Sequence, residues 1–159
     1  MKAGRLVVIG VDSSGHVKNP PIWMAATRTS KKSNQRYYGV YISVEKHGEL
    51  EQFSINWAEK VSAILIYRAT LPIFYEFDSI FIDSDFQGQT PYVEKYLKKL
   101  LRSKYPKKEA LANPTVYFIP ENKSKEIKDA HIKSQKMRGK KLHIYEVDPN
   151  LDNELEILK

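Results

Sequence analysis

Three short acidic motifs carry the residue types that could do chemistry in this chain. Asp12 follows the apolar run "LVVIGV", Asp83 follows "SIFI", and Asp129 lies in the basic stretch "KEIKDAHI". A carboxylate next to a buried apolar run needs a compensating partner, because burying an isolated charge is costly. Carboxylate oxygens are the ligands that Mg²⁺ takes in enzymes of phosphoryl transfer. The motifs therefore predict a site for Mg²⁺ or Mn²⁺.

Two further acids and two histidines lie close to these motifs. Asp85 comes two residues after Asp83 and shares its face of a strand, and Glu126 comes three residues before Asp129 on one helical face. His131 lies two residues beyond Asp129 and has the chemistry to assist proton transfer, as does His16 in the turn after Asp12.

Ordinary structural roles are open for the same residues. Asp83 and Asp85 have the chemistry to start a turn at a strand end. Asp129 has Lys125 and Lys133 at four residues on either side, so it has the spacing for ion pairs along a helix. Asp12 is the hardest to explain in this way, because the run before it is so apolar.

The elements that must position these acids follow from the periodicity of the sequence. Residues 6–12 are continuously apolar, which predicts a central strand buried on both faces and ending at Asp12. Two more strands on short connections indicate an antiparallel meander, followed by helices that alternate with strands. We expect strands over residues 6–12, 22–30, 36–46, 78–86 and 115–120, and helices over 56–72, 90–106 and 124–139.

The helix ends carry recognisable signals. Asn56 with Glu59 predicts a capping pair, Pro72 a helix stop, and Ser124 and Gly139 the two ends of the last helix. Residues 142–147, "LHIYEV", indicate an appendage or an edge strand, and an acidic end follows. We expect one domain over residues 1–142 and a C-terminal acidic extension over 143–159.

The order of elements and the places of the acids resemble the ribonuclease H-like superfamily, which includes ribonucleases H, Holliday-junction resolvases, transposases and Piwi-type nucleases. "VVIGVDSSG" is similar to its first-strand motif, "SIFIDSD" to its fourth-strand acid, and "KEIKDAHI" to its last-helix motif. The resemblance covers residues 6–140 and implies an α/β fold with a mixed five-stranded sheet, β-β-β-α-β-α-β-α, and helices on both faces.

The resemblance also implies roles for the acids. Asp12, Asp83 and Asp129 would be catalytic and would hold the metal ions, with Asp85 and Glu126 as further ligands. Ser13 follows Asp12 where type 2 ribonucleases H have Glu, and the turn after it departs from their glycine-rich one. In a type 2 alignment the last ligand shifts toward Glu121, directly after the fifth strand.

Composition bounds the class of protein. The chain has 159 residues, no cysteine, a net charge of +7 and no apolar run of membrane-spanning length, so we expect a cytoplasmic protein without disulfides. Its richness in Lys, Ile and Tyr indicates a thermophile or an AT-rich genome. Basic residues concentrate in 95–108 and 123–141, which favours a nucleic-acid partner. The expected contacts are Lys98, Lys99, Arg102, Lys133, Lys136 and Arg138.

These features together predict a nuclease that depends on Mg²⁺ or Mn²⁺ and cleaves phosphodiester bonds in DNA, RNA or an RNA/DNA hybrid. Two other classes stay open. One is a nucleic-acid-binding protein of the same fold without catalysis, which Ser13 favours. The other is a small structural protein whose acids only form turns.

Overall fold

The protein is described by a computed structural model that covers residues 8–16, 19–29, 35–51, 56–74, 79–83, 90–104, 115–140 and 145–159. Its strands are β1 (Val8–His16), β2 (Asn19–Thr29), β3 (Gln35–Ile42), β4 (Ser79–Asp83), β5 (Thr115–Ile119) and β6 (Tyr145–Val147). Its α-helices are α1 (Val44–Glu51), α2 (Trp57–Thr70), α3 (Thr90–Lys104), α5 (Lys125–Arg138) and α6 (Asp152–Ile157). The 3₁₀ turns are η1 (Leu71–Ile73) and η2 (Glu121–Lys123).

The described strands form one mixed sheet in the order β5-β4-β1-β2-β3-β6. β1, β2 and β3 are an antiparallel meander, whereas β4 is parallel to β1, β5 to β4, and β6 to β3. The predicted α/β class, the mixed sheet and the central position of β1 are confirmed. The expected count of five strands is wrong, because β6 adds a sixth at the β3 edge.

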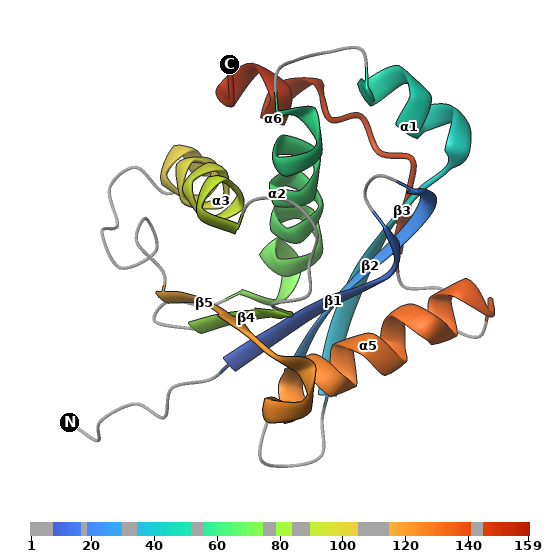
Figure 1. Ribbon diagram of the computed structural model, residues 1–159, viewed down its shortest axis with the longest axis vertical. Coiled ribbons are helices and arrows are strands. Elements are labelled where there is room, and N and C mark those ends of the chain that lie inside the picture. The colour runs from blue at the N-terminus through green and yellow to red at the C-terminus, as the bar shows by residue number, and fades with distance from the viewer. Residues whose placement is uncertain are drawn as a thin grey trace.

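Helices cover both faces of the sheet (Figure 1). Alternation along β1 directs Ile9 and Val11 into the core beneath α2, while Gly10 and Asp12 face α5. α2 is buried along most of its length, and α3 packs against it through Val93, Leu97, Leu100 and Leu101. The sheet therefore has a thick apolar side and a second side on which α5 lies over β1 and β2.

The position of α5 depends on its cap and on two glycines. The Ser124 hydroxyl accepts a hydrogen bond from the Ile127 N–H at 3.2 Å, and Gly139 follows the helix, so both predicted ends are confirmed. A Cβ on Gly10 would collide with the backbone of Glu126 and Ile127, and one on Gly39 with the Met137 side chain. The absence of these two Cβ atoms lets α5 approach the sheet closely.

Three predictions about element ends are corrected. Asp12 does not end the first strand: β1 continues to His16, because Ser13 and Ser14 still pair with β2. The third strand ends at Ile42 rather than near 46, because α1 begins at Val44. The Ser43 hydroxyl accepts a hydrogen bond from the Lys46 N–H at 3.2 Å at the start of this helix. Asn56 precedes α2 in the left-handed region with φ 61° and makes no side-chain cap.

The C-terminal segment packs on the domain rather than extending from it. Leu151 and Leu158 belong to the core. Arg68 of α2 binds Glu146 at 3.2 Å and Glu154 at 2.8 Å, and donates a hydrogen bond to the Asn150 carbonyl at 2.6 Å. Two of the acids at this end of the chain therefore bind α2, on the opposite side of the sheet from α5.

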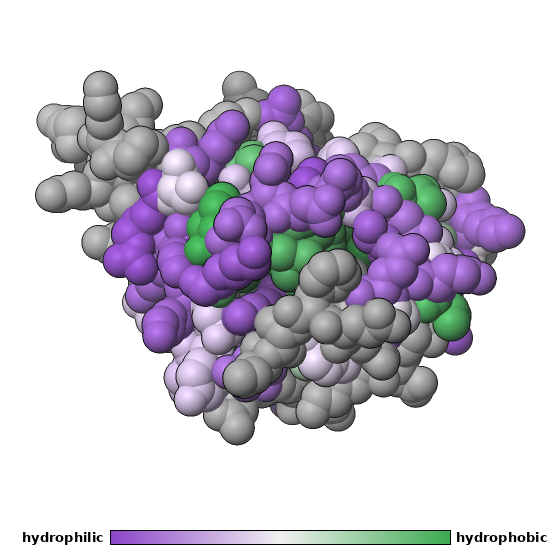
Figure 2. Space-filling model, turned by 90° about the horizontal axis from the view of Figure 1, so that it is seen from above, coloured by the Kyte–Doolittle hydropathy of each residue, from purple (hydrophilic) through white to green (hydrophobic). Residues whose placement is uncertain are grey.

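Figure 2 views the molecule from above relative to Figure 1, and the described residues on this side are mostly hydrophilic. Figure 2 shows its hydrophobic side chains in small separate areas between hydrophilic ones. None of the helices in the described part of the chain combines the length and the apolar character that crossing a membrane requires.

Candidate functional site

Asp12 lies where β1 separates from β4. The parallel ladder between the two strands ends at the pair Val11–Ile82. Its register aligns Gly10 with Phe81, so the next residues on that face are Asp12 and Asp83, the last residue of β4. Both residues are buried, with exposed fractions of 4% and 8%. The structure thus brings together two of the three predicted catalytic acids.

The Asp12 carboxylate is held by two groups on its own face of the sheet. Its Oδ1 accepts a hydrogen bond from the Ser13 N–H at 2.7 Å, and its Oδ2 lies 2.9 Å from Nδ1 of His131 on α5. His131 is therefore an α5 side chain that reaches Asp12, and its assistance in proton transfer stays a prediction.

The electrostatic environment of Asp12 is unfavourable for its charged form. The pKa of Asp12 is raised to about 7: burial is the largest cause, and the negative charges of Asp83 and Glu121 add to it, whereas the Ser13 N–H and His131 act in the opposite direction. The fold therefore disfavours the ionised form of this carboxyl group.

Glu121 is the third acid near Asp12. It opens η2, two residues after the last residue of β5, and β5 is parallel to β4. Because the ends of neighbouring parallel strands meet at one edge of a sheet, Glu121 comes close to Asp12. One ligand atom from each of Asp12, Glu121 and His131 lies within 4.8 Å of the other two. Glu121 is the position to which a type 2 alignment shifts the last ligand.

Glu126 and Asp129 have other neighbours. The Glu126 carboxylate accepts a hydrogen bond from the Ser124 hydroxyl at 3.3 Å. Asp129 lies near Lys133. Burial and the charge of Lys136 lower the pKa of Lys133, and the negative charge of Asp129 partly offsets this effect. Residues two apart on a helix are turned by about 200°, so with His131 directed at β1, Asp129 points elsewhere. Their roles as ligands stay predictions, and Asp85 lies outside the described residues.

The predicted nucleic-acid contacts lie on two sides of the sheet. Lys133, Lys136 and Arg138 are on α5, whereas Lys98, Lys99 and Arg102 are on α3, which packs on α2. The α5 group lies on the side of the sheet that Asp12 faces, and Figure 1 shows α5 on the opposite side of the sheet from α3. One surface that includes both groups is therefore not formed, and binding by either group stays a prediction.

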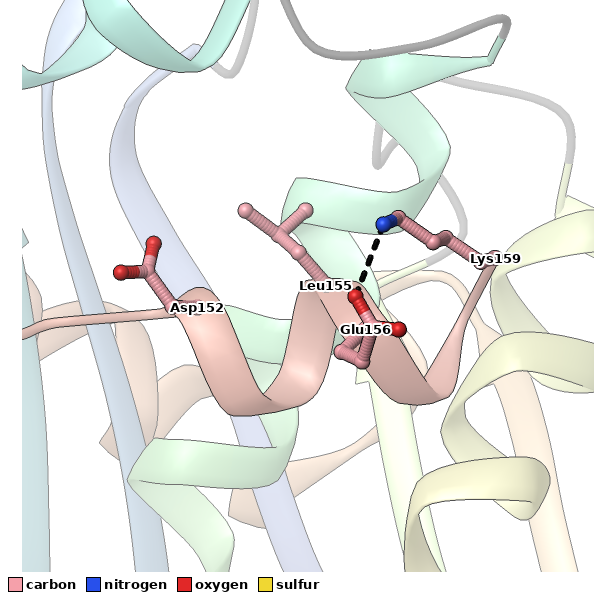
Figure 3. A pocket seen from close by; sticks show the side chains of 4 residues that line it. All are labelled: Asp152, Leu155, Glu156 and Lys159. Carbon is pink, nitrogen blue, oxygen red and sulfur yellow. Dashed lines mark ion pairs between the residues drawn. The ribbon is translucent and has the colours of Figure 1, made fainter.

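A shallow hollow of about 320 Å³ lies at the other end of the fold, on α6. Asp152, Leu155, Glu156 and Lys159 line it, and Glu156 and Lys159 form an ion pair at 2.8 Å (Figure 3). The ion pair neutralises Glu156 and Lys159 at the surface, and we assign no chemistry to the hollow.

Comparisons with known proteins identify no relative. No family model, no curated protein and no solved structure matches the chain significantly. The functional argument therefore depends on the geometry around Asp12.

Proposed function

We propose that the protein is a divalent-metal-dependent nuclease with a ribonuclease H-like fold. One observation carries the proposal: Asp12, Glu121 and His131 converge where the parallel pairing of β1 with β4 ends, with Asp83 acting on Asp12 from the neighbouring strand. The meander followed by alternating strands and helices supports the fold assignment.

The donor set fits a hard divalent cation. Asp12 and Glu121 offer carboxylate oxygens close to one another, and Asp83 offers a further carboxylate beside Asp12; Mg²⁺ and Mn²⁺ take such oxygens as ligands. Burial is the main cause of the raised pKa of Asp12, with the charges of Asp83 and Glu121 adding to it, and a cation would stabilise the ionised carboxylate. Bound cations would activate water and stabilise the developing charge on a phosphodiester.

The side chains around Asp12 have defined tasks in this proposal. Asp12, Asp83 and Glu121 hold the cations. The Ser13 N–H and His131 fix the orientation of the Asp12 carboxylate, as outer partners do for metal ligands. The half-exposed ring of His131 is also placed to exchange a proton with solvent near the reacting phosphate.

A nucleic-acid-binding protein without catalysis is the second candidate. The contact between Asp12 and His131 favours it, because Nδ1 of His131 already occupies Oδ2 of Asp12, an atom that a cation would need. In that case α5 would still present its cations to a phosphate backbone.

Cleavage separates the two candidates. Labelled RNA/DNA hybrid, duplex, single-strand and four-way-junction substrates are incubated with Mg²⁺, Mn²⁺ or EDTA. We expect metal-dependent cleavage that falls about a hundredfold or more in Asp12→Asn. The matched change Asp152→Asn, on exposed α6, leaves the rate unchanged. Intact substrates in every lane, with binding retained, would assign the protein to the second class.

A further inference from the structure

A row of side chains crosses the sheet one step beyond Asp12, on the same face. Ser14 of β1 pairs with Trp23 of β2, and Trp23 pairs with Tyr41 of β3. The Trp23 and Tyr41 rings lie 5.3 Å apart between centroids. Two residues along a strand span about 7 Å, so this row starts about 7 Å from Asp12.

Arg138, the last residue of α5, lies over this row. Its guanidinium carbon is 5.5 Å from the centroid of the Trp23 ring, and its Nη1 lies 3.5 Å from the Ser14 hydroxyl. Arg138 is exposed, and no carboxylate of the described residues forms an ion pair with it. The guanidinium is thus held in place by an aromatic face, and none of the described acids neutralises its charge.

The preceding turn of α5 also places a cation over an aromatic ring of the sheet. The Lys133 ammonium lies 4.7 Å from the centroid of the Tyr37 ring on β3. Lys136 lies three residues further along α5, so the two positive charges repel one another across one turn of the helix. An anion bound here would relieve that repulsion.

Packing alone explains these contacts less well. Lysine and arginine stems often cover apolar surface and leave their charged ends in water. Here Met137 already covers Gly39, the sheet position next to the row, and the Arg138 guanidinium is turned onto a ring and a hydroxyl. A planar guanidinium held beside aromatic rings matches the phosphate and the base of one nucleotide.

We propose that Arg138, Trp23 and Tyr41 form a subsite for the unpaired nucleotide next to the cleaved phosphodiester. Arg138 binds its phosphate, and Trp23 and Tyr41 stack on its base. The inference rests on the proposed function, because only cleavage at Asp12 would place this row next to the cleaved phosphodiester. It assigns the substrate to strands that are single at this position, since a base within a duplex has both faces covered.

The two tryptophans of the chain make a direct test available. Trp57, the other tryptophan, lies at the start of α2 against His47, at 5.0 Å between ring centroids. The Trp57→Phe variant therefore leaves Trp23 as the only indole. Oligothymidylate, oligouridylate and a duplex of equal length are titrated into this variant in EDTA, which prevents metal-dependent cleavage.

We expect single strands to quench Trp23 fluorescence and the duplex to do so at much higher concentration. In the same background, Arg138→Gln should weaken single-strand binding about tenfold and lower the salt slope by about one. Lys128→Gln removes the same charge from the exposed side of α5 and should leave affinity and quenching unchanged.

The outcomes separate this inference from the proposed function. Metal-dependent cleavage with unchanged Trp23 fluorescence, or with Arg138→Gln and Lys128→Gln equivalent, would overturn the subsite and leave the nuclease standing. Equal quenching by the duplex would overturn the assignment to single strands. Quenching that depends on Arg138, without cleavage under any metal, would support the nucleotide-binding row and overturn the nuclease.

Discussion

Asp12 Oδ2 lies 2.9 Å from Nδ1 of His131, which joins the central strand to the helix on the sheet's second face. The two residues are separated by 119 positions, so the contact forms only when α5 is seated on β1. Asp12 is also the residue whose ionisation the fold disfavours most clearly, since burial raises its pKa to about 7. Stability, metal binding and pH are therefore linked at one carboxylate.

Asp12→Asn should stabilise the metal-free protein at pH 8. The folded pKa of about 7 lies above the usual value of 3.8, so the folded state binds more protons than the unfolded chain between these values. The unfolding free energy of the wild type therefore falls as pH rises through this window. The neutral amide removes that loss, and we expect a gain of about 1–3 kcal/mol in urea unfolding. A wild-type stability that does not fall between pH 5 and pH 8 would contradict the assignment.

Cation binding should become stronger as pH rises through 7. A proton and a cation compete for Asp12, so Mg²⁺ or Mn²⁺ should raise the melting temperature more at pH 8 than at pH 6. The pH midpoint of cleavage should move down as the cation concentration increases. Thermal melts across a matrix of pH and cation concentration measure the effect. A cation shift that is equal at both pH values would exclude Asp12 as a ligand.

Glu121→Gln should weaken cation binding more than Glu126→Gln does. Glu121 contributes to the group within 4.8 Å, whereas the Glu126 carboxylate binds the Ser124 hydroxyl. We expect at least a tenfold rise in the Mn²⁺ dissociation constant for Glu121→Gln and less than a twofold rise for Glu126→Gln. Calorimetric titration with Mn²⁺ compares the two variants. A larger rise in the dissociation constant for Glu126→Gln would indicate that the ligand belongs to the last-helix motif instead of Glu121.

Gly10→Ala should displace α5. Its Cβ would collide with the helix backbone at Glu126, so we expect a loss of about 2–4 kcal/mol in urea unfolding, together with weaker cation binding. Gly48→Ala in α1 is the control, because a Cβ there meets no atom within 4 Å and alanine favours helix by about 1 kcal/mol. Equal effects of the two changes would mean that α5 does not depend on the glycine.

Arg68→Met should release the C-terminal segment. The change leaves Glu146 and Glu154 without their cation, and we expect a loss of about 2–4 kcal/mol with faster amide exchange in β6 and α6. The control is Lys98→Met, which breaks a more exposed pair with Glu94 and should change stability by less than about 0.5 kcal/mol. Unaltered exchange in β6 would show that the core contacts of Leu151 and Leu158 hold the segment alone.

Local signals predicted much of this fold. The apolar run before Asp12 identified the central strand, and Ser124 and Gly139 identified the ends of α5. The strand through Asp83 followed from alternation, with Ile80 and Ile82 in the core. In each of these places, short-range chemistry and long-range packing favour the same conformation.

Long-range contacts decided the rest. Pairing with β2 extends β1 beyond Asp12, which a turn-forming "DSSG" does not reveal. The rotation of α5 about its axis is set by Gly10 and Gly39, which are distant in sequence, and this rotation selects His131 rather than Asp129. Ser134 is polar but lies in the buried stripe of α5, so hydrophobic periodicity alone does not identify the face of the helix that packs on the sheet.

The pairing of β6 with β3 has a consequence for synthesis on the ribosome. β3 is complete at Ile42, but its outer neighbour, which begins at Tyr145, emerges more than a hundred residues later. Until then the outer edge of β3 lacks that partner, and exposed edges are where nascent chains associate with one another. Arg36, near the start of β3, is exposed and places a charge on that strand. β6 thus pairs with this edge only after residues 43–144 have been made, and strand pairing over such a separation is slow.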